Sequence, residues 1–166
     1  MTCNLYMEKF KKHLINTNIL TNFDIEDICK ILKVPLVKIA MKDEIHKLKN
    51  GCYILNLDDS QNQGTHWVAF AITDYYVLYS DSFGMPPPQD IYELFLKSKK
   101  DIYVNQRQYQ DIDSVLCGYF AVYFLFCMIY LKGKTMLDKY TKFVNQWDKK
   151  NFKNNNRVKQ IILSFI

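Results

Sequence analysis

Apolar residues recur along the chain with two different periods, which predict helices near both ends and strands in the middle. Residues 24–32 place apolar side chains at helical spacing after an acidic first turn, and Pro35 ends that helix. Residues 66–72 and 75–81 are rich in aromatic and β-branched residues, which is typical of strands. Both faces of these strands are mostly apolar, so we expect a sheet that is covered on both sides.

The rest of the pattern completes an α+β prediction. Residues 118–131 are apolar without interruption, and we expect a buried helix that begins close to Cys117. These fourteen residues are fewer than the roughly 20 of a membrane-spanning helix. The sequence therefore predicts a single α+β domain over residues 1–166, with no membrane partner. The other expected elements are a short helix over 43–49, strands over 52–57 and 101–109, a helix over 89–96, and one or two amphipathic basic helices from Thr135 onward.

The composition is that of an ordered globular protein, because 49% of the 166 residues are hydrophobic and 15% are aromatic. The net charge of +5 is unevenly distributed. Residues 132–166 hold nine of the 22 Lys and Arg and two of the 17 Asp and Glu, a net of +7, which leaves −2 for residues 1–131. We expect this basic segment either to contact a polyanion such as DNA or to form the solvated face of a helix.

Five cysteines are scattered along the chain: Cys3, Cys29, Cys52, Cys117 and Cys127. None belongs to a C-x-x-C pair, and none lies near a histidine at the spacing of a zinc site. An odd and dispersed set is typical of reduced thiols, and no secretory signal is recognisable at the N-terminus. We therefore expect an intracellular, reducing location and no bound metal.

The two central strands predict a contact between His66 and Asp81. If residues 73–74 form a two-residue turn, the numbers of opposed residues sum to 147, which places His66 opposite Asp81. Opposed residues share a face and lie close enough for a carboxylate to hold an imidazole. Such a contact fixes the ring tautomer and stabilises the imidazolium. Taken singly, each residue is more often an ordinary surface, core or turn residue.

Cys117 is a candidate nucleophile because it stands where a polar loop meets the apolar helix. Backbone N–H groups at a helix N-terminus favour a thiolate, and the N–H of Cys117 itself would help to form an oxyanion hole. Gly118 gives a substrate room to approach. The alternative is a structural thiol at the start of a core helix, a description that also fits Cys29, Cys52 and Cys127.

Gln110 is a candidate oxyanion donor, since it lies seven residues before Cys117 in the preceding polar loop. A side-chain amide there could direct an N–H at the developing negative charge. Gln106 and Gln108 are competitors that spacing alone does not exclude, and a solvated loop glutamine is the alternative for all three.

Together these segments resemble the adenovirus-type and SUMO-protease-type superfamily of cysteine peptidases. The motifs that carry the resemblance are G-T-H-W-V-A-F over 64–70, Y-S-D-S-F-G over 79–84 and Q-x-x-x-S-x-x-C-G-Y-F over 110–120. Their order of His, acid, Gln and Cys is that of the family. The spacing from Gln to Cys is similar to the adenovirus protease in particular. Residues 20–25 and 56–60 are similar to capsid-maturation proteases of virophages and Polinton-like elements.

The resemblance implies a role for each site residue: Cys117 as nucleophile, His66 as general base, Asp81 as the residue that orients it, and Gln110 as oxyanion donor. Trp67 would pack beside the substrate site, although a core tryptophan is the equal alternative. The implied fold is a permuted relative of papain, a mixed sheet with the cysteine helix packed against it. Asp81 stands where the adenovirus enzyme has Glu, a variation that the family tolerates.

The resemblance also implies a function, the cleavage of viral capsid or core precursors at small, Gly-rich sites, in the virion and the infected host cell. The alternatives are a protease that removes a ubiquitin-like modifier and a catalytically silent scaffold that binds nucleic acid. The chemistry requires no cofactor. Because no cysteine occurs between Cys52 and Cys117, activation by a disulfide-bonded peptide is not expected; DNA or another peptide stays open as activator. We expect a monomer.

Overall fold

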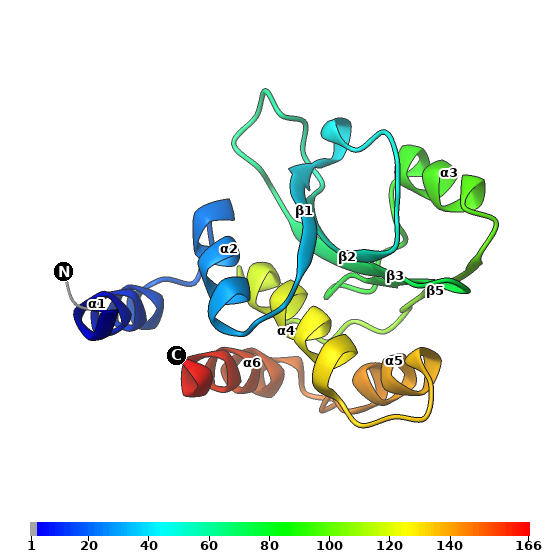
Figure 1. Ribbon diagram of the computed structural model, residues 1–166. Helices are drawn as coiled ribbons and strands as arrows, with labels where there is room; N and C mark the ends of the chain where they lie inside the picture. Colours follow the sequence, from blue (N-terminus) through cyan, green and yellow to red (C-terminus); the bar gives the residue numbers. More distant parts are fainter. Residues whose placement is uncertain (1–2) are drawn as a thin grey trace.

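A five-stranded mixed sheet forms the centre of the computed structural model, which describes residues 3–166 (Figure 1). The strands follow one another in chain order across the sheet, and only β3 runs against its neighbours. The carboxyl ends of the other four strands therefore meet the amino end of β3 at one edge. The strands are β1 Leu36–Met41, β2 Gly51–Asn56, β3 Trp67–Ile72, β4 Tyr76–Ser80 and β5 Asp101–Val104.

The two faces of the sheet carry separate hydrophobic clusters, because successive side chains of a strand point to opposite faces. On one face, large side chains such as Phe70 and Tyr79 pack against Phe95 of helix α3 (Gln89–Lys97). On the other, β3 presents the small residues Ala69 and Ala71 to helix α4 (Cys117–Tyr130). Small side chains let this helix lie close to the central strand, which places its first residue at the edge described above.

Helix α4 is the buried helix that the apolar run predicts. It lies between the sheet and a layer of helices formed by α2 (Asn22–Ile31), α5 (Met136–Asn145) and α6 (Asn151–Phe165), and α1 (Cys3–Asn16) packs beside α6 (Figure 1). This explains why α4 is apolar on every side. Within residues 3–166, the structure contains no helix with the length and hydrophobicity required to cross a membrane.

Several elements differ from the predicted ones. The helix over 43–49 is reduced to the 3-10 turn η1 (Lys42–Glu44), and the strand over 101–109 ends at Val104. Helix α1 and strand β1 were not predicted; β1 is an edge strand that pairs only with β2. The strands over 52–57, 66–72 and 75–81, the helices over 24–32 and 89–96, and two helices after Thr135 are present with ends shifted by one or two residues.

The predicted hairpin register is wrong by two residues. The pairs Ile72–Val77 and Ala69–Ser80 have numbers that sum to 149, not 147. The turn is longer than expected because the Thr73 hydroxyl accepts hydrogen bonds from the backbone N–H groups of Tyr75 and Tyr76, at 3.2 and 2.9 Å. A slip of two residues leaves every side chain on its original face, since the side-chain period of a strand is two.

Candidate active site

His66 and Asp81 meet at the sheet edge where β3 begins and β4 has just ended. Nε2 of His66 lies 2.9 Å from Oδ1 of Asp81, and the two side chains are 15% and 1% exposed. The backbone N–H of Phe83 donates to the same oxygen at 2.7 Å. The rings of Phe83 and His66 stack with centroids 4.9 Å apart. The carboxylate and the phenyl ring thus hold the imidazole from two sides.

Asn105 fixes the backbone of Asp81, a contact that the sequence did not predict. Its side-chain oxygen accepts from the Asp81 N–H at 2.9 Å, and its amide nitrogen donates to the Asp81 carbonyl at 2.7 Å. The same nitrogen donates to the carbonyl of Arg107 at 3.0 Å, so the chain turns away from the sheet after Val104. These bonds explain why β5 is shorter than predicted.

Cys117 is the first residue of α4 and lines a cleft together with His66. The first N–H groups of a helix have no partner within it and favour negative charge, here that of a thiolate. Cys117 is partly exposed, whereas Cys29, Cys52 and Cys127 are buried. Burial raises the pKa of Cys29 to about 12 and the pKa values of Cys52 and Cys127 to about 11. These three thiols stay protonated at neutral pH and fit a structural role.

The surroundings of His66 favour its protonated form. Burial of the ring lowers its pKa, but the hydrogen bonds and charges of Asp81 and Cys117 outweigh burial and raise the pKa from 6.5 to about 9. Because Nε2 faces Asp81, Nδ1 is the ring nitrogen left for the thiol. An imidazolium beside a cysteine stabilises the thiolate, which is the reactive form. The arrangement therefore favours a protonated imidazole beside the thiol.

Gln110 is fully buried behind the same cleft, in the loop that leads to α4. Its Oε1 accepts from the hydroxyl of Ser82 at 2.5 Å, and its Nε2 donates to the carbonyl of Ser114 at 2.7 Å. An amide nitrogen carries two N–H groups, so one remains for a group in the cleft. Of the three glutamines considered, Gln110 alone lines this cleft; Gln106 lines a separate groove, and Gln108 donates to the Gln110 carbonyl.

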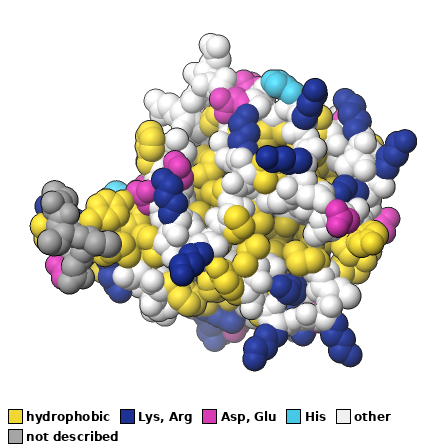
Figure 2. All heavy atoms as spheres, in the orientation of Figure 1, with side chains coloured by type: hydrophobic (Ala, Val, Ile, Leu, Met, Phe, Trp, Pro, Cys, Tyr) yellow, Lys and Arg dark blue, Asp and Glu magenta, His cyan; other side chains and the backbone are white. Residues whose placement is uncertain are grey.

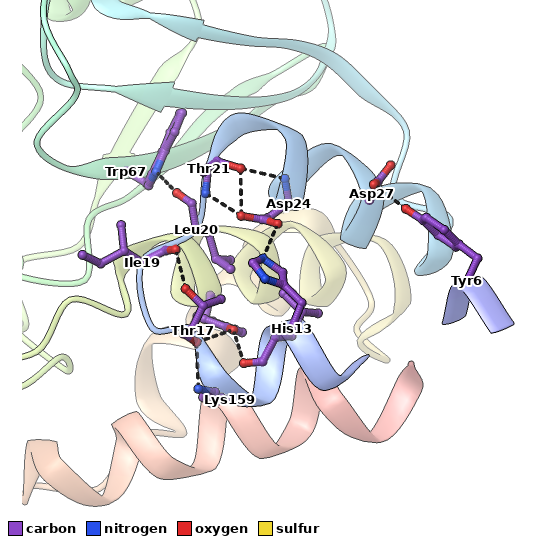
Figure 3. Close-up of polar contacts among 12 residues, drawn as sticks. Tyr6, His13, Thr17, Ile19, Leu20, Thr21, Asp24, Asp27, Trp67 and Lys159 are labelled. Carbon is purple, nitrogen blue, oxygen red and sulfur yellow. Dashed lines mark hydrogen bonds and ion pairs between the residues drawn. The ribbon is translucent and has the colours of Figure 1, made fainter. Parts of the chain in front are cut away.

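The cleft has a volume of about 630 Å³ and two unlike walls. One wall is the connector between α1 and α2 (residues 17–21, called the α1–α2 connector), and the other is the polar loop over residues 60–65. Trp67 lines the cleft, packs against the core and donates its Nε1–H to the carbonyl of Leu20 at 3.0 Å (Figure 3). The tryptophan is thus both a core residue and a neighbour of the cleft.

The α1–α2 connector is held by contacts from distant parts of the chain, and the sequence did not predict its place in the site. The Lys159 ammonium of α6 donates to the Thr17 carbonyl at 2.8 Å (Figure 3). It also donates to the carbonyl of Ile15 at 3.0 Å. The Tyr119 hydroxyl donates to the Thr17 carbonyl at 3.0 Å. Leu20 itself packs on Gly118, where an added Cβ would lie 3.0 Å from the leucine Cβ. Gly118 therefore admits the connector beside the thiol.

The basic C-terminal segment has in part a structural role. Lys139 donates to the carbonyls of Met128 and Ile129 at the end of α4, both at 3.0 Å, as Lys159 does at the end of α1. Cations are favourable at helix C-termini. Figure 2 shows Lys and Arg side chains dispersed over the visible face. Among residues 5–166, the structure groups no set of three or more potential metal-binding side chains.

Comparison with known proteins shows a likeness of fold but no match in sequence. No protein-family model and no curated protein sequence matches the chain. The fold is similar to that of the ASFV pS273R protease in its crystal structure, with a TM-score of 0.60 and 16% sequence identity. The match covers 91% of this chain and 69% of that protein. At this identity the likeness establishes the α+β fold, a mixed sheet flanked by helices, and the chemistry rests on the side chains.

Proposed function

We propose that the protein is a cysteine endopeptidase with Cys117 as nucleophile, His66 as its acid–base partner and Asp81 as the residue that orients the ring. The observation that supports this most directly is that His66 and Cys117 line one cleft while the buried Asp81 holds the imidazole from behind. The hydrogen bond from His66 to Asp81 is 2.9 Å long, and Cys117 and Asp81 together raise the pKa of the imidazole to about 9.

The reaction follows from these positions. The thiolate attacks the substrate carbonyl carbon, an S–C bond forms, and the π electron pair moves onto oxygen. The oxyanion accepts hydrogen bonds from the Cys117 backbone N–H and the Gln110 amide. Its collapse breaks the C–N bond as the imidazolium of His66 donates a proton to the leaving amine. Water then attacks the thioester carbon while His66 takes its proton, and a C–O bond forms. Collapse of this second tetrahedral intermediate breaks the C–S bond, which releases the acid and restores the thiolate and imidazolium.

The proposed substrates are viral capsid or core precursors, cut within small, Gly-rich segments. The lining of the cleft supports a neutral substrate segment, because Glu44 is its only acidic residue and His66 its only basic one. Motifs resembling maturation proteases support the viral assignment. The alternative with the same chemistry, removal of a ubiquitin-like modifier, differs only in the substrate.

The first experiment measures the reactivity of Cys117 without any knowledge of the substrate. Mass spectrometry after treatment with iodoacetamide at pH 7 should show Cys117 alkylated well before Cys29 and Cys52 in the folded protein, because thiolates react and buried thiols do not. His66→Ala should slow the alkylation of Cys117 alone. Equal rates at the three thiols would count against an activated nucleophile.

Cleavage is then tested on a Gly-Gly-containing peptide and on a fusion with a SUMO-type modifier. Wild-type protein should cut the peptide and Cys117→Ala should not, while Cys117→Ser keeps the size of the side chain as a control. Cleavage that persists in Cys117→Ala would refute the nucleophile. Exclusive cleavage of the fusion would favour the deconjugating alternative.

The basic segment over residues 132–166 is proposed as a DNA contact. Lys132, Lys134, Lys149 and Lys150 are exposed and support this role, whereas Lys139 and Lys159 hold helix ends. Electrostatic binding to DNA should weaken steeply as salt rises. Replacing the four exposed lysines by glutamine should flatten that dependence; no binding by wild type at low salt would reduce the segment to a solvated surface.

A further inference from the structure

Ser82, the residue after the proposed acid, is joined to the proposed oxyanion donor Gln110 by two hydrogen bonds. Ser82 is 3% exposed and Gln110 is fully buried. The Ser82 hydroxyl donates to Oε1 of Gln110 at 2.5 Å, and the Ser82 carbonyl accepts from the backbone N–H of Gln110 at 3.0 Å. The same carbonyl accepts from the N–H of Tyr109 at 3.0 Å. Ser82 therefore holds both the backbone and the side chain of the donor.

The two ends of the Gln110 amide are fixed by different groups. The carbonyl of Ser114 can only accept, so it selects the nitrogen end, at 2.7 Å. The hydroxyl of Ser82 then supplies the partner of the oxygen end. With both ends held, the amide plane cannot turn, and the second N–H of Nε2 keeps one direction relative to the cleft that Gln110 and Cys117 both line.

We infer that Ser82 is a positioning residue for the oxyanion hole, which acts through the Gln110 amide and couples it to the segment that carries Asp81. The inference rests on the proposed function and deepens it. Without the hydroxyl, Oε1 of Gln110 is a buried acceptor with no partner, and such groups shift to recover a hydrogen bond. A donor displaced from the oxyanion loses its effect, whereas the thiol and the imidazole keep their contacts.

The molecule provides a matched control. The Ser80 hydroxyl bonds the Tyr109 hydroxyl and so links the same two chain segments without touching Gln110. Ser80 is also 3% exposed, so Ser80→Ala removes a buried hydroxyl of the same kind two residues away. An effect that Ser82→Ala shows and Ser80→Ala does not is therefore attributed to the lost contact with the Gln110 side-chain amide.

Two probes of Cys117 separate the oxyanion hole from the nucleophile. Iodoacetamide alkylates the thiolate by displacement and forms no oxyanion. An N-acetylated Gly-Gly aldehyde adds the sulfur to its carbonyl carbon, and the electron pair of the C=O bond moves to the oxygen, which then lies in the hole. The affinity of the aldehyde is measured as protection of Cys117 from iodoacetamide, read by mass spectrometry.

Ser82→Ala should weaken aldehyde binding about tenfold to a hundredfold, somewhat less than the roughly 10²–10³-fold cost of deleting an oxyanion donor. The rate at which iodoacetamide alkylates Cys117 in this variant should stay within twofold of wild type. Ser80→Ala should match wild type in both alkylation rate and aldehyde affinity. In a Gln110→Ala background, the further change Ser82→Ala should have no effect on aldehyde binding, because the two residues act as one unit. In Ser82→Cys the thiol is a weak donor of similar size, so this variant should lose an intermediate amount of aldehyde affinity. It also replaces Ser82→Ala in the test if Ser82→Ala does not fold.

Unchanged aldehyde affinity in Ser82→Ala would overturn the inference, as would a parallel loss of alkylation and aldehyde binding. An additional loss in the Gln110→Ala background would show that Ser82 acts by another route. Failure of the proposed function has a different signature: wild-type protein would neither bind the aldehyde nor alkylate Cys117 faster than its buried thiols.

Discussion

Two histidine–aspartate pairs in this molecule have the same geometry but very different surroundings. In both, Nε2 of the histidine lies 2.9 Å from Oδ1 of the aspartate. The His66–Asp81 pair is 15% and 1% exposed, whereas the His13–Asp24 pair is 52% and 12% exposed. His13 joins α1 to the start of α2 (Figure 3), and His66 lies at the sheet edge beside Cys117. The distance between the two side chains therefore does not distinguish the His13–Asp24 pair from the proposed catalytic pair.

The two aspartates differ in the hydrogen bonds that their carboxylates make besides the one to histidine. Oδ2 of Asp24 accepts from the N–H and the hydroxyl of Thr21, at 2.9 and 2.8 Å, and completes the capping box of α2. Asp24 would be needed there without any histidine. Asp81 has a buried Oδ2 with no hydrogen-bond partner in the described part of the chain, and its bonded oxygen serves only the ring and the Phe83 N–H. Its environment is organised around the imidazole.

The largest expected difference between the two pairs is the effect on kcat/KM of removing the imidazole of each histidine. His66→Ala should reduce kcat/KM on a cleaved peptide by at least about a thousandfold, since a positioned acid–base group contributes roughly 10²–10⁴-fold and the thiolate loses its partner as well. His13→Ala should leave kcat/KM within threefold. Comparable losses in the two variants, measured on folded protein, would remove the basis for treating the pairs differently.

A second contrast comes from the carboxylates. Asp81→Asn should lower kcat about a hundredfold or more, because an amide in place of the carboxylate no longer favours the imidazolium or its orientation. Asp24→Ala should instead lower the free energy of unfolding by about 1–2 kcal/mol through loss of the helix cap, as measured by urea denaturation. A loss of kcat in Asp24→Ala larger than in Asp81→Asn would reverse the assignment.

The pH dependence sharpens the comparison further. The pKa of His66 is raised from 6.5 to about 9 by Asp81 and Cys117 against the effect of burial. A raised pKa means that its stabilising contribution is complete below about pH 6.5 and is lost as the pH rises through about 9. We therefore expect peptide cleavage to fall above pH 9, about tenfold per pH unit, as the acid that protonates the leaving amine disappears. A basic limb near pH 7 would contradict the ion pair.

Much of the framework that supports the pairs could be predicted from local pattern. Apolar periodicity identified α2, α4 and the central hairpin, and strand parity kept His66 and Asp81 on one face although the register was wrong by two residues. The error arose from one side chain, because the Thr73 hydroxyl lengthens the turn. Periodicity is a local property, and it is reliable where burial alone determines which face a residue takes.

The walls of the cleft depend on contacts that no local pattern contains. The α1–α2 connector is fixed by Trp67 and Lys159, which bond residues 47 and 142 positions away in the sequence. Likewise, the bonds from Asn105 to Asp81 and from Ser82 to Gln110 span 24 and 28 positions. Sequence spacing could suggest Gln110 but could not separate it from Gln106 and Gln108, because only the fold shows which glutamine lines the cleft.

The smallest expected effect concerns the stability contributed by the His13 pair. A half-exposed ion pair contributes about 0–1 kcal/mol, and salt screens it. His13→Ala should therefore lower the free energy of unfolding by no more than about 1 kcal/mol at pH 6, and part of the difference should vanish in 1 M salt. The stacking of the ring on Phe10, with centroids 6.3 Å apart, should persist at high salt and account for the remainder.

If His13→Ala instead raised KM strongly while stability barely changed, the junction of α1 and α2 would control the position of the α1–α2 connector in the cleft. The second pair would then belong to the binding site and not to the scaffold.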